Sequence, residues 1–123
     1  MCIRDRNNYE ECISALKKFD GVMVGRAVYS NPLIWQKTDA ILFGEKEKEI
    51  SASQVLKGLI PYAQKHLLRN GRLWDICKHT LQLVQGVKGA RRWRKEMTEQ
   101  AQNNKADVII LENAARQLED AGL

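Results

Sequence analysis

The chain has 123 residues, which suits one small domain of ~100 to 150 residues or a part of a larger protein. With 44% hydrophobic and 28% charged residues, its composition excludes a disordered chain, a collagen and a disulfide scaffold. The longest apolar run is far shorter than the ~20 residues of a membrane span, and no signal-peptide core opens the chain. We therefore expect a cytoplasmic protein without membrane contact.

The positive charge is concentrated in one segment. The net charge is +5, yet residues 65–95 hold nine Lys and Arg against one acid, and residues 96–123 carry an excess of acids. A local excess of this kind predicts an acidic partner, with nucleic acid as the leading class.

The first third of the chain combines a predicted helix with a predicted strand. Residues 1–6 fit no following element and are interpreted as a non-native leader. A helix is expected from Asn7, with Asn8 and Glu11 as its capping pair. Residues 21–25 (Gly-Val-Met-Val-Gly) are typical of a strand buried on both faces of a parallel sheet. Because a lone strand cannot satisfy its ladder hydrogen bonds, we expect residues 7–44 to be the last unit of a sheet cut from a longer protein.

The rest of the chain has helical patterns. Residues 45–50 form a charged linker, and residues 51–123 are predicted to build an all-helical bundle domain with its own core. The expected helices begin at Pro32, at Ser51 or Ser53, at Leu73, at Ala90 and near residue 106, and they end at Gly44, Asn70-Gly71, Gly86, Ala101 and Ala121. The chain as a whole is therefore expected to be mostly α-helical.

The first candidate site follows the predicted strand. Ligands of α/β proteins lie at the carboxyl ends of parallel strands, where a following helix offers backbone N–H groups to an anion. Gly25 would let a phosphate approach the backbone, and Arg26 would add positive charge. The simpler interpretation is a turn glycine followed by a surface arginine.

The second candidate site is a basic helix face after Gly89. With Trp93 turned toward the core, the helical period directs its cationic neighbours outward, where forked side chains on a rigid element suit phosphates. A solvated surface is the simpler interpretation. The cations of this face are Arg91, Arg92, Arg94 and Lys95, and Lys78 of the preceding predicted helix would extend it.

The remaining reactive side chains form no catalytic set. His66 and His79 lack carboxylate or thiol companions at ligand spacing, so we expect structural or surface histidines and no metal site. Cys2, Cys12 and Cys77 are an odd number without a close pair, which predicts reduced thiols. No nucleophile, base and orienting group occur together, and catalytic residues are expected to be absent from this chain.

Three separated stretches of the sequence resemble tRNA-dihydrouridine synthases, closest to the A-type bacterial branch. They are residues 20–32 (DGVMVGRAVYSNP), residues 76–86 with Ile76-Cys77-Lys78-His79 and Gln85-Gly86, and residues 89–95 (GARRWRK). The resemblance runs in register over residues 7–123 and includes Ala106-Asp107-Val108. It implies the end of a flavin-containing (β/α)8 barrel, or TIM barrel, followed by a helical tRNA-binding domain.

The resemblance also implies a chemistry and site roles. The family reduces the C5–C6 double bond of uridines in the tRNA D-loop with FMN and NADPH, while a cysteine protonates the uracil ring. Gly25 and Arg26 match positions that would hold the FMN phosphate, and Arg91 and Arg94 match the surface that would meet tRNA. None of the three cysteines matches the catalytic one, so the chain alone is expected to be inactive.

Two other functions remain open from the sequence. One is a stand-alone basic helical module that binds RNA without catalysis, and the other is a helical interaction protein whose basic face meets an acidic protein or a membrane surface. The predicted strand favours the synthase, since a helix-only binder has no use for it. We expect the synthase fragment to be a monomer.

Overall fold

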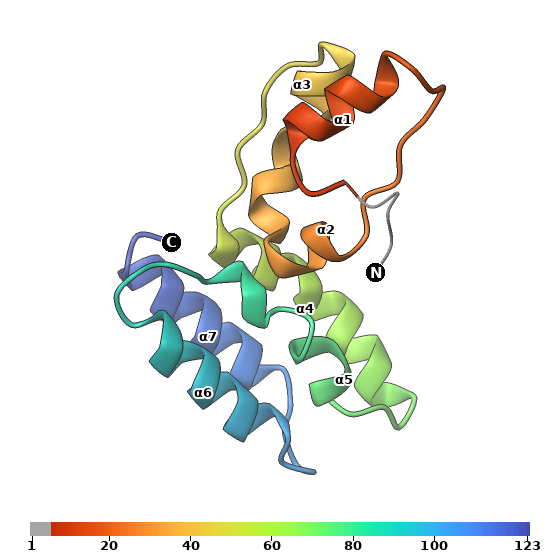
Figure 1. Ribbon diagram of the computed structural model, residues 1–123. Helices are drawn as coiled ribbons and strands as arrows, with labels where there is room; N and C mark the ends of the chain where they lie inside the picture. Colours follow the sequence, from red (N-terminus) through yellow and green to blue (C-terminus); the bar gives the residue numbers. More distant parts are fainter. Residues whose placement is uncertain (1–5) are drawn as a thin grey trace. The chain divides into compact units, whose positions relative to one another are not determined.

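The computed structural model describes residues 6–123, so the predicted leader lies outside the described residues except for Arg6 (Figure 1). The chain divides into two compact units, residues 1–49 and residues 50–123. Most of the described residues are helical, as expected, and residues 6–123 contain no β-strand. No helix in this range is long and apolar enough to span a bilayer.

Unit 1 begins with helix α1 (Tyr9–Leu16), whose predicted cap is confirmed. Asn8 Oδ1 accepts a hydrogen bond from Glu11 N at 2.9 Å, and Glu11 Oε2 accepts one from Asn7 N at 2.8 Å. The first bond satisfies an amide that the first turn of a helix leaves without a partner, and the second ties Glu11 to Asn7, the residue before the N-cap. The helix ends at Leu16, and Phe19 lies beyond it and is exposed.

The next predicted helix is divided into two segments. A 3-10 helix, η1 (Pro32–Lys37), is followed by α3 (Thr38–Phe43), and Gly44 ends α3 at a left-handed φ of 68°. Thr38 Oγ1 donates to Trp35 O at 2.6 Å, where the two segments meet. Tyr9 joins α1 to this region, since its hydroxyl donates to Ile34 O at 2.9 Å and its ring lies 4.8 Å from that of Trp35.

The predicted buried strand at residues 21–25 is wrong for the structure described here. Met23 alone makes an isolated β-bridge, and Arg6 N donates to Met23 O at 3.3 Å. The Met23 side chain is 52% exposed. A buried strand needs neighbours on both sides to satisfy its amides and carbonyls, and no ladder forms on this segment within residues 6–49. A short helix, α2 (Arg26–Ser30), follows it directly.

Unit 2 is built on α4 (Ala52–Leu68), α6 (Ala90–Ala101) and α7 (Ile109–Asp120) (Figure 1). Ser51 caps α4 through a complete capping box with Gln54. The most extensive helix packing is between α4 and α7, and α6 packs on α7. The core of this unit includes Leu56, Ala63, Leu73, Ile76, Cys77, Val84, Trp93, Met97, Leu111, Ala115 and Leu118.

The helix predicted from Leu73 to Gly86 is also wrong as a continuous element. The structure has a short α5 (Trp74–Cys77) and a 3-10 turn, η2 (Leu81–Leu83). Thr80 N and Thr80 Oγ1 both donate to Cys77 O, at 3.0 and 2.7 Å. Both bonds close a turn at Thr80, and the α-helical pattern does not continue beyond it.

Candidate functional site

Gly25 and Arg26 lie where the extended segment passes into α2. Gly25 is the N-cap of α2 with φ −106° and ψ −100°, and it makes no side-chain cap because it has no side chain. The first turn of α2 holds no acidic residue, and Arg26 is exposed. The positive end of a helix and a guanidinium therefore adjoin each other, which is an arrangement that favours an anion.

The α6 face, formed by Arg91, Arg92, Arg94 and Lys95, is held in place by Trp93. The indole of Trp93 is buried at 6% exposure, and its Nε1 donates to Ala114 O of α7 at 3.3 Å. Ala90, Met97 and Ala101 complete the buried side of α6, as the sequence predicts. The cations consequently occupy the sides of α6 that turn away from α7.

Three of the four cations on the α6 face have partners within unit 2. Arg92 Nε lies 3.0 Å from Glu96 Oε1, and Lys95 Nζ lies 4.0 Å from Glu99 Oε1. Arg94 is half-buried, and its Nη1 donates to Val84 O at 2.5 Å. Each acid follows its cation by one helical turn, so the first turns of α6 are less positive than the segment charge suggests.

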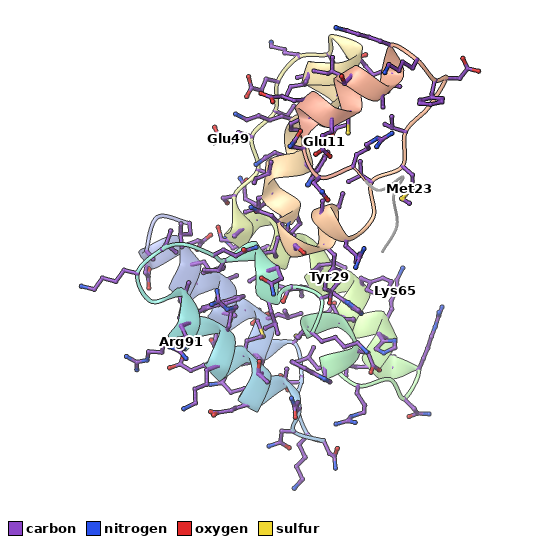
Figure 2. The ribbon with its side chains drawn as sticks, viewed as in Figure 1. Glu11, Met23, Tyr29, Glu49, Lys65 and Arg91 are labelled. Atoms are coloured by element: carbon purple, nitrogen blue, oxygen red, sulfur yellow. The ribbon has the colours of Figure 1, made fainter. Side chains whose placement is uncertain are left out.

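Arg91 is the exception on this face. It is exposed, and within the described part of the chain its guanidinium makes no hydrogen bond or ion pair. Figure 2 labels Arg91 on α6 and Lys65 on α4, on opposite sides of the helical unit. The basic segment 65–95 is thus continuous in sequence but divided between two surfaces of unit 2.

Lys78 lies at the end of α5, beside Asp75. The helix that was expected to carry Lys78 ends at Cys77, and Lys78 is the C-cap of α5. Its ammonium helps to lower the pKa of Asp75, which is a residue of α5. Lys78 therefore belongs with α5 and the end of α4.

His66 and Asp75 connect α4 to α5. His66 Nε2 lies 2.9 Å from Asp75 Oδ2, and Arg72 N donates to the same oxygen at 3.1 Å. The hydrogen bond to His66 is the main cause that lowers the pKa of Asp75, followed by the bond from Arg72 N. A Cβ atom at Gly71 would overlap the His66 ring, so the imidazole lies directly against the backbone there. His66 is a structural histidine, as predicted.

The cysteines of the described region are buried. Cys12 and Cys77 have 0% exposure and are free thiols, and Cys2 lies outside the described residues. Burial raises the pKa of Cys77 to about 11 and also raises the pKa of Cys12. Neither thiol can reach a bound molecule. Residues 6–123 also contain no group of three potential metal ligands.

The exposed face of α4 carries a group of side chains that was not predicted as a site. Tyr62, Lys65 and Arg69 line this face at helical spacings, and none of them has a partner in residues 6–123. The signal was present in the sequence, because an aromatic and two cations follow each other at i, i+3 and i+7 opposite the apolar stripe of α4.

Comparison with known proteins places the chain in a family. A family described as dihydrouridine synthase (Dus) matches residues 3–120. The tRNA-dihydrouridine(20/20a) synthase of Escherichia coli (strain K12) is 37% identical over 111 residues, which cover 90% of this chain and 32% of that protein. The synthase of Salmonella typhimurium (strain LT2) is 38% identical over 111 residues, covering 90% and 33%. The synthase of Pseudomonas putida (strain KT2440) is 34% identical over 110 residues, covering 89% and 33%.

The chain belongs to the dihydrouridine synthase family, and its relatives support the A-type bacterial branch. It spans about a third of the length of the curated relatives that it matches.

Proposed function

We propose that this chain is a C-terminal part of an FMN-dependent tRNA-dihydrouridine synthase, which reduces uridines of the tRNA D-loop. The observation that carries the proposal is the family match over residues 3–120, with 37% identity to a tRNA-dihydrouridine(20/20a) synthase over 90% of the chain. In this proposal residues 7–44 are the end of a (β/α)8 barrel, residues 45–50 are a linker, and residues 51–123 are a tRNA-binding domain. A cytoplasmic monomer is the corresponding expectation.

The proposed role of unit 2 is to bind tRNA. Its buried core holds the helices in a defined arrangement, and its exposed cations include Arg91, Lys65 and Lys78. Phosphate contacts of this kind supply most of the sequence-independent affinity for nucleic acid. Arg92 and Lys95 would exchange their acidic partners for phosphates, whereas Arg94 would act by holding Val84 O.

The proposed role of Gly25 and Arg26 is to hold the phosphate of FMN. The residues fit this group in charge, because an acid-free first turn and a guanidinium both attract an anion. When bound, reduced FMN supplies the hydride that saturates the C5–C6 bond of uracil, with NADPH as the source of reducing equivalents. Gly25 and Arg26 would bind and orient the phosphate end only.

The proton that completes the reduction must come from a residue outside this chain. Cys12 and Cys77 are buried and remain protonated thiols at neutral pH, since burial raises the pKa of each. Neither can act as the exposed acid beside a bound base. We therefore propose that hydride and proton transfer require the parent enzyme, and that the chain alone is inactive.

A stand-alone RNA-binding module is the alternative function. The observation that favours it is that unit 2 buries a core of its own. The family match argues against it, because the match extends through unit 1, which such a module does not need.

The test is the dihydrouridine content of tRNA in the host organism. Disruption of the gene should abolish dihydrouridine at tRNA positions 20 and 20a, the positions in the relatives' name. Mass spectrometry of digested tRNA measures this loss. The intact gene should restore the modification, and a gene with Arg26→Ala should restore much less of it. Lys18→Ala, which removes another exposed cation of unit 1, serves as the matched control. Unchanged dihydrouridine after disruption would refute the proposed function.

A further inference from the structure

The exposed face of α4 presents an aromatic ring and two cations in one line. Tyr62, Lys65 and Arg69 lie one above another along the helix, because residues three and four positions apart share a face. Leu56 and Ala63 on the other side of α4 are fully buried. The ring of Tyr62 is turned outward, and the residue is 62% exposed.

Lys78 adjoins this line through the His66–Asp75 pair. His66 lies one turn before Arg69 on α4, and Asp75 lies one turn before Lys78 on α5. His66 Nε2 and Asp75 Oδ2 lie 2.9 Å apart, so the end of α4 and the helix α5 are in contact at this pair. Gly71 keeps the connecting turn tight, since the His66 ring occupies the space of a Cβ there.

Little negative charge balances these cations. Asp75 is the one acid in residues 65–95, and its carboxylate already accepts from Arg72 N and contacts His66. Lys65, Arg69 and Lys78 are exposed and make no ion pair in the described part of the chain. On the α6 face, in contrast, Glu96 and Glu99 lie beside Arg92 and Lys95.

We propose that Tyr62, Lys65, Arg69 and Lys78 form an RNA-binding surface, named here the α4–α5 surface. Its three cations contact phosphates, and the ring of Tyr62 stacks on an unpaired base. Exposed aromatics among cations on a rigid element are the means by which proteins hold unstacked nucleotides. The inference rests on the proposed function, and it assigns the principal tRNA contact to the α4–α5 surface rather than to the α6 face.

The experiment measures the affinity of the full chain for an unmodified tRNA transcript at several salt concentrations. A triple variant, Lys65→Gln, Arg69→Gln and Lys78→Gln, should bind about 10- to 100-fold more weakly near 0.1 M salt, with a salt slope smaller by two to three. The control triple Lys17→Gln, Lys18→Gln and Lys48→Gln makes the same charge change on unit 1 and should alter affinity much less. Arg91→Gln should also have a smaller effect than the α4–α5 triple.

A second arm isolates the base contact. Tyr62→Leu should weaken tRNA binding roughly five-fold or more, and Tyr62→Phe should retain it, because stacking needs the ring and not the hydroxyl. Heparin, a polyanion without bases, should bind the wild type and Tyr62→Leu equally. All substituted side chains are exposed, and thermal unfolding of each variant verifies that the fold is kept.

The outcomes separate this inference from the proposed function. If the wild type binds tRNA but the α4–α5 triple weakens it no more than the control triple, the α4–α5 surface is refuted and the tRNA partner stands. If Tyr62→Leu weakens tRNA and heparin binding equally, the base contact is refuted. If the wild type binds no tRNA at low salt, both this inference and the proposed tRNA-binding role are refuted.

Discussion

At the scale of single residues, the electrostatic environment of Asp75 makes the stability of the chain depend on pH. Its hydrogen bonds with His66 and Arg72 N lower its pKa below the ordinary value of 3.8. A carboxyl whose pKa is lower in the folded state stabilises the fold above its unfolded pKa. That contribution is lost as the pH falls through the folded pKa.

We predict that Asp75→Asn flattens the acid side of the stability profile. Between about pH 5 and pH 3 the wild type should lose more unfolding free energy than the variant, because its unfolded state takes up a proton at this carboxylate more readily than its folded state does. Urea denaturation across this pH range measures the difference. Glu112→Gln is the control, since it removes an exposed acid whose side chain has no hydrogen-bonding partner in the described structure. Its free energy of unfolding should fall with pH as steeply as that of the wild type. Parallel losses in wild type and Asp75→Asn would contradict the prediction.

At the scale of elements, α6 depends on its buried side rather than on its cations. Met97 is 2% exposed and packs within the core of unit 2, whereas Arg91 lies on the surface. We predict that Met97→Ala lowers the free energy of unfolding by about 2 to 5 kcal/mol, because it removes buried apolar atoms and leaves a cavity. Arg91→Ala should change it by less than about 0.5 kcal/mol. Urea denaturation followed by circular dichroism measures both, and equal effects would show that α6 is not anchored as described.

The elements that the sequence predicted well are those governed by local periodicity. The buried residues Ala90, Trp93, Met97 and Ala101 of α6 follow directly from a 3.6-residue repeat. The break after Cys77 was missed because the apolar period continues through residues 78–84, and the turn at Thr80, whose hydroxyl donates to Cys77 O, leaves no signal in that period. The strand predicted at residues 21–25 does not form, because strand formation depends on partners that no local pattern specifies.

For the α6 face, the sequence predicted which side chains are exposed but not all of their contacts. Arg91 of the α6 face is exposed, as the period of α6 requires. Arg94 is instead bound to Val84 O, a contact across ten residues that sequence spacing does not indicate. The ion pairs of Glu96 and Glu99, by contrast, could be predicted, because each acid lies one turn after its cation in the sequence. The net charge of a helix face therefore has to be summed over the residues of that face, not over a continuous segment of the chain.

At the scale of the whole molecule, the chain carries only one end of the proposed FMN site. A short first turn and one guanidinium provide few contacts, and net affinity requires many contacts to offset the entropy lost on binding. We predict that the 123-residue chain does not bind FMN at micromolar concentration. Flavin fluorescence should stay constant when the protein is titrated into FMN. Saturable quenching would contradict this prediction and would mean that unit 1 alone forms a flavin pocket.

The contact between Gly71 and His66 offers a spectroscopic probe of the α4–α5 surface. Because the imidazole lies where a Cβ would be, the α-protons of Gly71 are within the ring current of His66 and should resonate at unusual chemical shifts. Any movement of α5 relative to the end of α4 would change these shifts. The glycine would thus report on this contact in solution without a label or a substitution, and it would do so while RNA is titrated.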